Sequence, residues 1–156
     1  MAERDESRFI AWSAELRAVH ARLRKALAAT RQALAEGEPL QSASRDLLLF
    51  CHGFCVALSG HHVAEDRELF PTIAAEHPEL GETLRKLEQD HTMMAHLIAG
   101  LQSAVDTRAT PEQLTRHLEG LGAIMENHFR YEERELLVIL ETLGLDTEPA
   151  RALGSF

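Results

Sequence analysis

Apolar side chains recur every three or four residues through four long stretches of the chain, and this period limits the possible folds most strongly. The stretches span residues 4–36, 42–75, 78–105 and 110–143. A stripe with this period is typical of an amphipathic α-helix that buries one face. No stretch alternates apolar and polar residues with the period of two that indicates a β-strand. We therefore predict an all-α fold built from four long helices.

Glycine and proline residues mark the ends of these stretches. Gly37 ends the first and Gly144 the fourth, while Pro78 begins the third. Thr110 precedes Gln113 by three residues, which predicts a capping box at the start of the fourth helix. Because the connections are short, neighbouring helices are expected to be antiparallel, in an up-down-up-down four-helix bundle.

The composition indicates one domain that binds neither nucleic acid nor a membrane. We assign residues 1–144 of the 156 to the bundle and residues 145–156 to a C-terminal tail. The net charge of −9 disfavours nucleic acid and anionic lipid as partners. No apolar run approaches the ~20 residues that a membrane span needs. No secretory pattern follows residues 1–8, so we expect a cytoplasmic protein.

Cys51 and Cys55 are four residues apart, which predicts small buried side chains rather than a CxxC motif.

Six residues of the kinds that bind metals lie on the predicted inner faces. They are His20, His61, Glu65, His91, His128 and Glu132. His61 and Glu65 are four residues apart, and so are His128 and Glu132, so each pair points in one direction on a helix. A helix rises about 1.5 Å per residue, and antiparallel packing then brings all four stretches to a similar height at these positions.

Metal coordination explains why these polar side chains share one layer of the core. Buried imidazoles and carboxylates without partners would be very costly. Nitrogen and carboxylate ligands without a thiolate suit iron, manganese or zinc. Each carboxylate can bridge two metals, which leaves two of the four imidazoles for each metal. We therefore predict a dinuclear site with open coordination positions.

Some neighbouring residues offer alternatives to these six. His62 and Asp66 form a rival register to His61 and Glu65, which we favour, and Glu133 is a rival to Glu132. Ligating histidines usually donate their second N–H to a carboxylate or carbonyl. The candidates for this outer role are Asp66, Asp90, Glu126 and Glu133.

The remaining histidines and the only tyrosine are placed outside the predicted ligand set. His96 follows His91 by five residues, which turns it about 140° around the helix. His117 is about three turns from His128 and is expected at the surface or in an outer role. We expect His77 in a solvated connection and His52 with Cys55 on a packed or half-exposed face. Tyr131 adjoins Glu132 and is either an outer hydrogen-bond donor or a ligand.

The order of these residues resembles the hemerythrin-like (HHE) cation-binding proteins over about residues 9–143. The matching positions are His20, His61-x3-Glu65 followed by Leu69-Phe70-Pro71, Asp90-His91, and His128-x3-Glu132. The resemblance implies a four-helix bundle with a centre of two non-haem iron ions, bridged by an oxo or hydroxo group and the two carboxylates. It makes manganese or zinc the less favoured metals.

Two positions differ from the oxygen-carrying hemerythrins. Their third helix has HxxxH, whereas Ala95 follows His91 by four residues here, and their last motif is HxxxxD, whereas Glu132 follows His128 by four. The absent fifth histidine predicts one iron that is more open or bound by water. The pattern is closer to the iron-centre-repair and mycobacterial hemerythrin-like branches, which are linked to nitric oxide, peroxide and redox stress.

We therefore predict a di-iron protein that binds or senses oxygen, nitric oxide or peroxide, in oxidative or nitrosative stress or in iron homeostasis. The alternatives are a catalase-like or oxidase enzyme, a protein of iron storage or iron-centre repair, and a bundle with one structural metal. The sequence shows no clear set of polar docking groups for an organic substrate, which favours a small ligand. It leaves open the redox partner and the choice between monomer and homodimer.

Overall fold

The computed structural model describes residues 11–35, 43–143, 145 and 147–154, without the side chains of residues 43–52. Its helices are α2 (Trp12–Ala35), α3 (Ala43–Ala64), the π-helix η1 (Glu65–Leu69), α4 (Phe70–Glu76), the 3₁₀ helix η2 (Pro78–Leu80), α5 (Gly81–Asp106), α6 (Pro111–Leu140) and α7 (Pro149–Leu153). The described residues contain no β-strand, which confirms the all-α prediction. They also contain shorter helices that the prediction of four long helices did not include.

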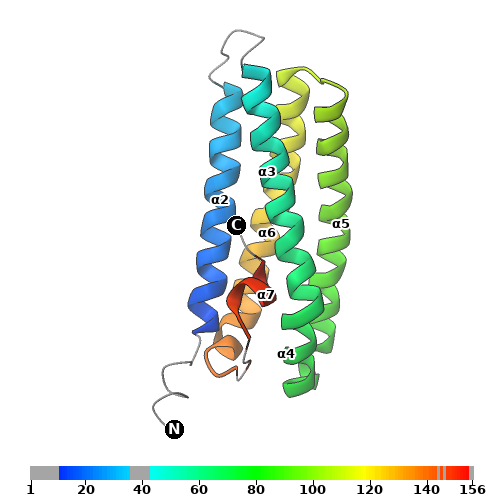
Figure 1. Cartoon of the computed structure of the whole chain (residues 1–156). Coiled ribbons are helices and arrows are strands. Elements are labelled where there is room, and N and C mark those ends of the chain that lie inside the picture. Colours follow the sequence, from blue (N-terminus) through cyan, green and yellow to red (C-terminus); the bar gives the residue numbers. More distant parts are fainter. Residues whose placement is uncertain (1–10, 36–42, 144, 146, 155–156) are drawn as a thin grey trace.

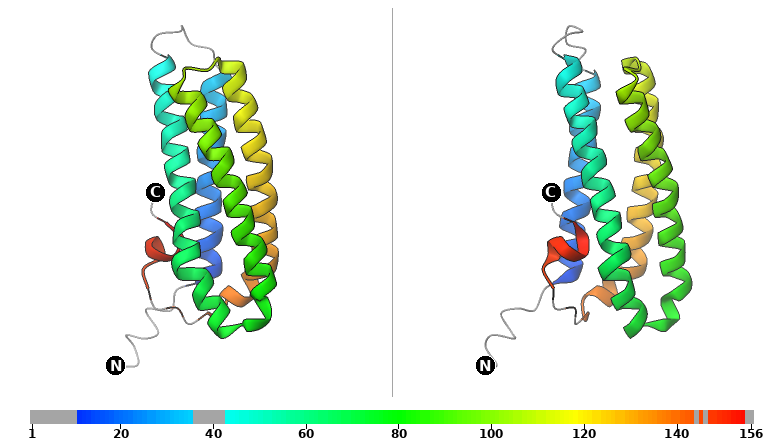
Figure 2. Two further views of the ribbon diagram at one scale, coloured as in Figure 1. Left: turned by 90° about the vertical axis from the view of Figure 1, so that its right-hand side faces the viewer. Right: turned by 45° about the vertical axis from the view of Figure 1, so that its right-hand side comes forward.

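Helices α2, α3, α5 and α6 lie side by side, and the chain direction alternates from each to the next (Figures 1 and 2). Helix α2 packs against α3 and α6, and α5 packs against the same two helices. Each long helix therefore has two long neighbours, and their inner faces enclose a common core. No helix in the described part of the chain combines the length and the apolar character needed to cross a membrane.

The core contains the apolar stripes that the sequence predicts. On α2, the side chains of Trp12, Leu16, Val19 and Leu23 are no more than 1% exposed. The inner face of α5 is built the same way, by Leu84, Leu87, Met94, Ile98, Leu101 and Val105. Burial of such side chains contributes about 1.5–3 kcal/mol each relative to exposure. These stripes fix the rotation of each helix, and with it the direction of the polar residues between them.

The connection between α5 and α6 contains the predicted capping box. The Gln113 backbone N–H donates to Thr110 Oγ1 at 3.2 Å, and the Thr110 backbone N–H donates to Gln113 Oε1 at 3.0 Å. Arg108 has a φ of 55° in this turn. The predicted helix end at Gly37 lies outside the described residues, as does Gly144.

Helices α3 and α4 are joined by the π-helix η1, and a new helix begins at Phe70, just before Pro71. The Phe70 backbone N–H donates to the Glu65 carbonyl, five residues earlier. Pro71 lies in the first turn of α4, where a missing N–H is tolerated. The wider turn changes the rotation of the helix at Glu65.

The C-terminal segment also packs on the bundle. Helix α7 contacts α3, η1 and α2 (Figure 1). Before it, the Leu145 carbonyl accepts a hydrogen bond of 3.1 Å from Trp12 Nε1. The tail predicted from residue 145 onward therefore includes a helix that covers one side of α3.

Candidate metal centre

Seven metal-binding side chains meet in the core as two groups. The first group is His62, Glu65, His91 and His128, and the second is His20, His61 and Glu132. Within each group, one nitrogen or oxygen atom from every residue lies within 4.8 Å of the others. All seven side chains are no more than 5% exposed. Each group can hold one metal ion.

The two glutamates lie between the groups. Glu65 Oε1 is 3.5 Å from His91 Nε2 in its own group and 3.1 Å from His61 Nε2 in the other. Glu132 Oε2 is 3.7 Å from His20 Nε2 and 3.2 Å from His128 Nε2 of the first group. Each carboxylate therefore contacts imidazoles of both groups, which is the arrangement a bridging ligand needs.

The inner atoms of this cluster lack hydrogen-bond partners among the described residues. Both carboxylate oxygens of Glu65 and of Glu132 are buried without such a partner, and so is Nε2 of His20, His61 and His62. A buried unsatisfied polar group costs about 1–3 kcal/mol, and a charged one more. Seven such atoms around one point fit cations, because a metal would accept all their lone pairs.

Four of the five imidazoles have an outer partner on Nδ1. The hydrogen bonds are His20 to Glu133 at 2.7 Å, His61 to the Leu153 carbonyl at 2.7 Å, His91 to Asp66 at 2.8 Å, and His128 to Asp90 at 3.2 Å. A carbonyl and a carboxylate accept, so Nδ1 donates and the Nε2 lone pair is left for the cluster. In the pair His91 and His128 this brings two Nε2 atoms to 3.0 Å from each other. Two lone pairs at that distance repel, and either a proton on one Nε2 or a cation between the two atoms removes the repulsion.

Comparison with protein-family models identifies the fold around this cluster. The model of the hemerythrin HHE cation binding domain matches residues 13–140, a range that includes all seven residues. The chain belongs to the hemerythrin HHE cation-binding family. No curated protein and no solved structure matched the chain in the parallel comparisons. The family assignment establishes a cation-binding domain, and the buried groups are where this HHE domain can hold its metal.

Each of the six residues predicted from the sequence belongs to one of the two groups, and their role as ligands stays a prediction. The prediction included four imidazoles, with His61 and His62 as rival registers, whereas the two groups contain five imidazoles. Successive helical residues differ by about 100° in direction, so His61 faces the second group and His62 the first. The fifth imidazole therefore comes from α3 rather than from position 95 on α5. The adjacent pair of histidines on a broad apolar stripe was the available signal.

The residues proposed for outer roles lie around the HHE cluster, by which we mean the seven residues of the two groups. Asp66 and Glu133 were rivals to predicted ligands, but they accept hydrogen bonds from His91 and His20. Arg24 orients Glu133, because its Nη1 lies 3.3 Å from Glu133 Oε1 while its Nε donates to Glu126 at 2.9 Å. The hydrogen bond from His20 holds the pKa of the Glu133 carboxyl below its usual range, and so Glu133 stays an acceptor.

Stacked rings restrict the rotation of three imidazoles. Phe129 stacks on His20 with ring centroids 3.8 Å apart and an interplanar angle of 7°. His62 stacks on one face of His91 at 4.0 Å, and Phe70 stacks on His91 at 5.5 Å. These contacts keep the ring planes fixed, which reduces the entropy lost when a metal binds.

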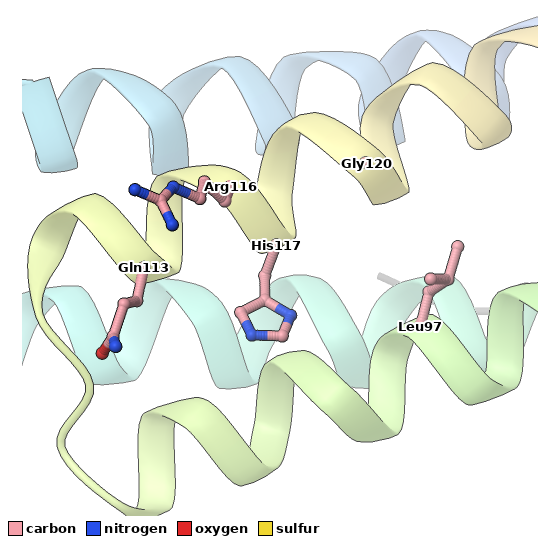
Figure 3. A pocket seen from close by; sticks show the side chains of 5 residues that line it. All are labelled: Leu97, Gln113, Arg116, His117 and Gly120. Atoms are coloured by element: carbon pink, nitrogen blue, oxygen red, sulfur yellow. The ribbon is translucent and has the colours of Figure 1, made fainter.

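The other candidate residues lie away from the HHE cluster. His96 is exposed on α5, and His77 is half-buried and lies 3.1 Å from Glu79. His117 is exposed, and its ring extends from α6 toward α5 in a surface pocket of about 360 Å³ (Figure 3). That pocket is lined by Leu97, Gln113, Arg116, His117 and Gly120. It contains none of the seven cluster residues.

Tyr131 and Cys55 take no part in either group. The Tyr131 ring is half-buried, and the Lys86 ammonium lies 4.0 Å from its centroid. Cys55 is buried, as predicted. The side chains of Cys51 and His52 lie outside the part that the structure describes.

Burial sets the protonation of the inner ligands in the metal-free chain. It lowers the pKa of His61 from 6.5 to about 3 and, together with the nearby His91, holds the pKa of His62 well below its usual range. Burial and the negative charge of Glu132 raise the pKa of Glu65 well above its usual range. Both histidines are therefore neutral at pH 7 and carry a free lone pair.

We expect the metal-free HHE domain to lose stability as the pH falls from 6.5 to 5. The unfolded chain protonates His61 and His62 in this window, whereas the folded chain does not, and the raised pKa of Glu65 offsets one of these protons. The net difference grows from near zero at pH 6.5 to about one proton at pH 5, where the free energy of unfolding falls by about 1.4 kcal/mol per pH unit. Urea denaturation of the metal-free protein at several pH values measures this slope.

The variant His62→Phe is the control for this slope. It keeps an aromatic ring against His91 but removes one group that titrates in the unfolded chain, so the slope should fall nearly to zero. An unfolding free energy of the parent protein that does not change between pH 5 and 6.5 would contradict the expectation.

Proposed function

We propose that this HHE domain holds a di-iron centre that binds or senses a small ligand, namely oxygen, nitric oxide or peroxide. The observation that carries the proposal is the position of Glu65 and Glu132, each in contact with imidazoles of both groups. Carboxylates in that position suit two cations better than one. His62, His91 and His128 would hold one ion, and His20 and His61 the other.

The chemistry of the ligand set supports iron. Five imidazoles and two carboxylates, with no thiolate in either group, suit iron, manganese or zinc. The carboxylates Asp66, Asp90 and Glu133 on the outer Nδ1 atoms make their imidazoles stronger donors. Iron would supply redox chemistry and coordination positions that a small ligand can occupy.

The two groups contain different numbers of imidazoles, which supports binding of the small ligand at only one of the two proposed ions. The first group has three imidazoles and the second has two. If both glutamates were shared, an ion held by His20 and His61 would have one protein ligand fewer, and a small ligand would bind there. The phenyl ring of Phe129 stacks on His20 and also lies edge-on to His61 at 6.1 Å, which makes this side apolar.

The enclosure of the cluster favours a ligand of two or three atoms. All seven side chains are essentially buried, so they exclude bulk water from the centre. An organic substrate would need a channel lined with polar groups. The pocket between α5 and α6 does not supply one, because it contains no residue of the cluster (Figure 3).

Metal analysis and three reactions test the proposal. Purified protein is analysed for iron, manganese and zinc, loaded anaerobically with ferrous iron, and then exposed separately to air, nitric oxide and peroxide. Two irons per chain and a stable, reversible absorption band with one of these ligands support binding or sensing. Sustained oxygen evolution from peroxide would replace the proposal with a catalase-like enzyme, and bleaching with iron release would replace it with storage or repair. Uptake of one ion or none would refute the di-iron centre.

A further inference from the structure

Helix α7 provides a main-chain atom to the surroundings of the candidate metal centre. The Leu153 carbonyl accepts a hydrogen bond of 2.7 Å from His61 Nδ1, although the two residues are 92 positions apart in sequence. Because a carbonyl cannot donate, this contact keeps the proton on Nδ1. The lone pair is then on Nε2, the atom that lies 3.1 Å from Glu65 Oε1.

His61 differs in this respect from the other three imidazoles that have outer partners. Those three donate to carboxylates on the long helices or on η1, which are Glu133, Asp66 and Asp90. Among the described residues, the hydrogen-bond partner of His61 Nδ1 is a carbonyl of a five-residue helix that follows the bundle. The orientation of one proposed ligand therefore depends on whether α7 is docked.

Burial of two apolar side chains holds α7 in place. Ala152 and Leu153 are 0% exposed, and α7 packs against α3 and η1. Arg151 Nε lies 3.5 Å from Glu68 Oε1, but this pair is at the surface and contributes little. A short helix held mainly by two side chains can be displaced by one substitution without opening the four long helices.

Gly154 allows the close approach of α7 to His61. Its φ is +88°, a conformation that residues with a Cβ rarely adopt. A Cβ at this position would lie 2.9 Å from the His61 backbone nitrogen and 3.1 Å from the Gly60 carbonyl carbon. These are backbone atoms of α3, which cannot move aside as a flexible side chain can. Any larger residue must shift the end of α7 away from His61.

We infer that α7 is a positioning element of the metal centre, in which the Leu153 carbonyl sets the tautomer of His61 and Gly154 permits the contact. The inference rests on the proposed centre, because His61 must be a ligand for its tautomer to affect metal binding. Without the carbonyl, the His61 proton distributes between Nδ1 and Nε2 and the ring loses its fixed orientation. Loss of such an outer partner typically lowers metal affinity about 10–100-fold.

Two substitutions in the full-length chain displace α7 in different ways. Gly154→Ala adds the Cβ that contacts α3, and Ala152→Asp buries a charge under α7. The matched controls are Gly120→Ala, where a Cβ meets nothing within 4 Å, and Ala150→Asp on the exposed side of α7. Circular dichroism verifies that each variant keeps its helices.

Anaerobic titration with ferrous or cobaltous ion measures affinity for each of the two equivalents. We expect one equivalent to bind about 10–100-fold more weakly in Gly154→Ala and Ala152→Asp. The other equivalent, and both equivalents in the control variants, should bind with the affinity of the parent protein. Parental affinity for both ions in the two α7 variants would overturn the inference.

Nitrogen-15 NMR of the histidine rings in metal-free protein gives a second readout that needs no metal. The parent protein should show His61 protonated on Nδ1 alone, and the α7 variants should show a mixture of tautomers. Retention of the single tautomer in both α7 variants would refute the role of the carbonyl. Failure of the parent protein to bind metal would instead refute the proposed function, while the tautomer measurement would still decide whether α7 orients the ring.

Discussion

Replacement of Glu65 by glutamine is expected to lower the metal content from two ions per chain to at most one. Glu65 lies between the two groups, 3.1 Å from His61 Nε2 and 3.5 Å from His91 Nε2. A neutral amide has nearly the same shape but gives up the charge and one of the two oxygens that a bridging ligand needs. Metal analysis after dialysis against a small excess of ferrous iron should find at most one ion in Glu65→Gln.

The stability of this variant separates a lost ligand from a damaged fold. A metal that binds only the folded chain raises the free energy of unfolding by about 2.7 kcal/mol at 100 times its dissociation constant. The parent protein should gain stability on this scale with iron, and Glu65→Gln should gain much less. Without metal, the variant should be about as stable as the parent, because the raised pKa keeps Glu65 protonated in the metal-free chain and a neutral amide then replaces a neutral acid.

Glu88→Gln is the matched control, since Glu88 is exposed on α5 and belongs to neither group. It should load metal as the parent protein does. If Glu65→Gln also takes up two ions and gains the same stability from them, Glu65 is not a shared ligand and the di-iron arrangement is wrong.

Replacement of His62 by alanine is expected to remove one metal ion, whereas replacement of His96 should remove none. His62 is 5% exposed and its Nε2 has no hydrogen-bond partner among the described residues. His96 is exposed and lies outside both groups. The loss of affinity in His62→Ala should exceed the roughly 10–100-fold cost of removing an outer partner.

The pair of variants decides where the fifth imidazole comes from. Anaerobic titration with cobaltous ion, followed by its visible absorption, counts nitrogen-rich sites in each variant. Full loading of His62→Ala would show that the first group needs only His91 and His128. Loss of an ion in His96→Ala would show that α5 is rotated so that His96 faces the core.

Periodicity was sufficient to predict the helices and the inner positions of most of the site. The spacing of apolar residues determines which face of each helix is buried, and His20, His91 and His128 lie on those faces. The four-residue spacing selected Glu65 and Glu132 for the same reason. These features depend only on the spacing of nearby residues, so they can be predicted from a single sequence.

The features that the sequence did not predict depend on backbone atoms or on how each helix is rotated about its axis. Neither of these produces a repeating pattern in the sequence. The π-helix at Glu65–Leu69 interrupts the regular α-helical spacing after α3, and apolar periodicity does not predict it. Four carboxylates were candidates for outer roles, but pairing Asp90 with His128 and Asp66 with His91 depends on how the helices are turned. The Leu153 carbonyl is a backbone atom on a helix too short to show a period.

The adjacency of His61 and His62 has a consequence for the order in which metal is taken up. One peptide bond joins His62 of the first group to His61 of the second, and in the proposed centre each imidazole would bind its own ion. Occupation of one position then immobilises the backbone that presents the neighbouring ligand, and the second ion meets a smaller entropy cost. Uptake should therefore be cooperative, so that half-filled chains are rare at intermediate iron concentrations.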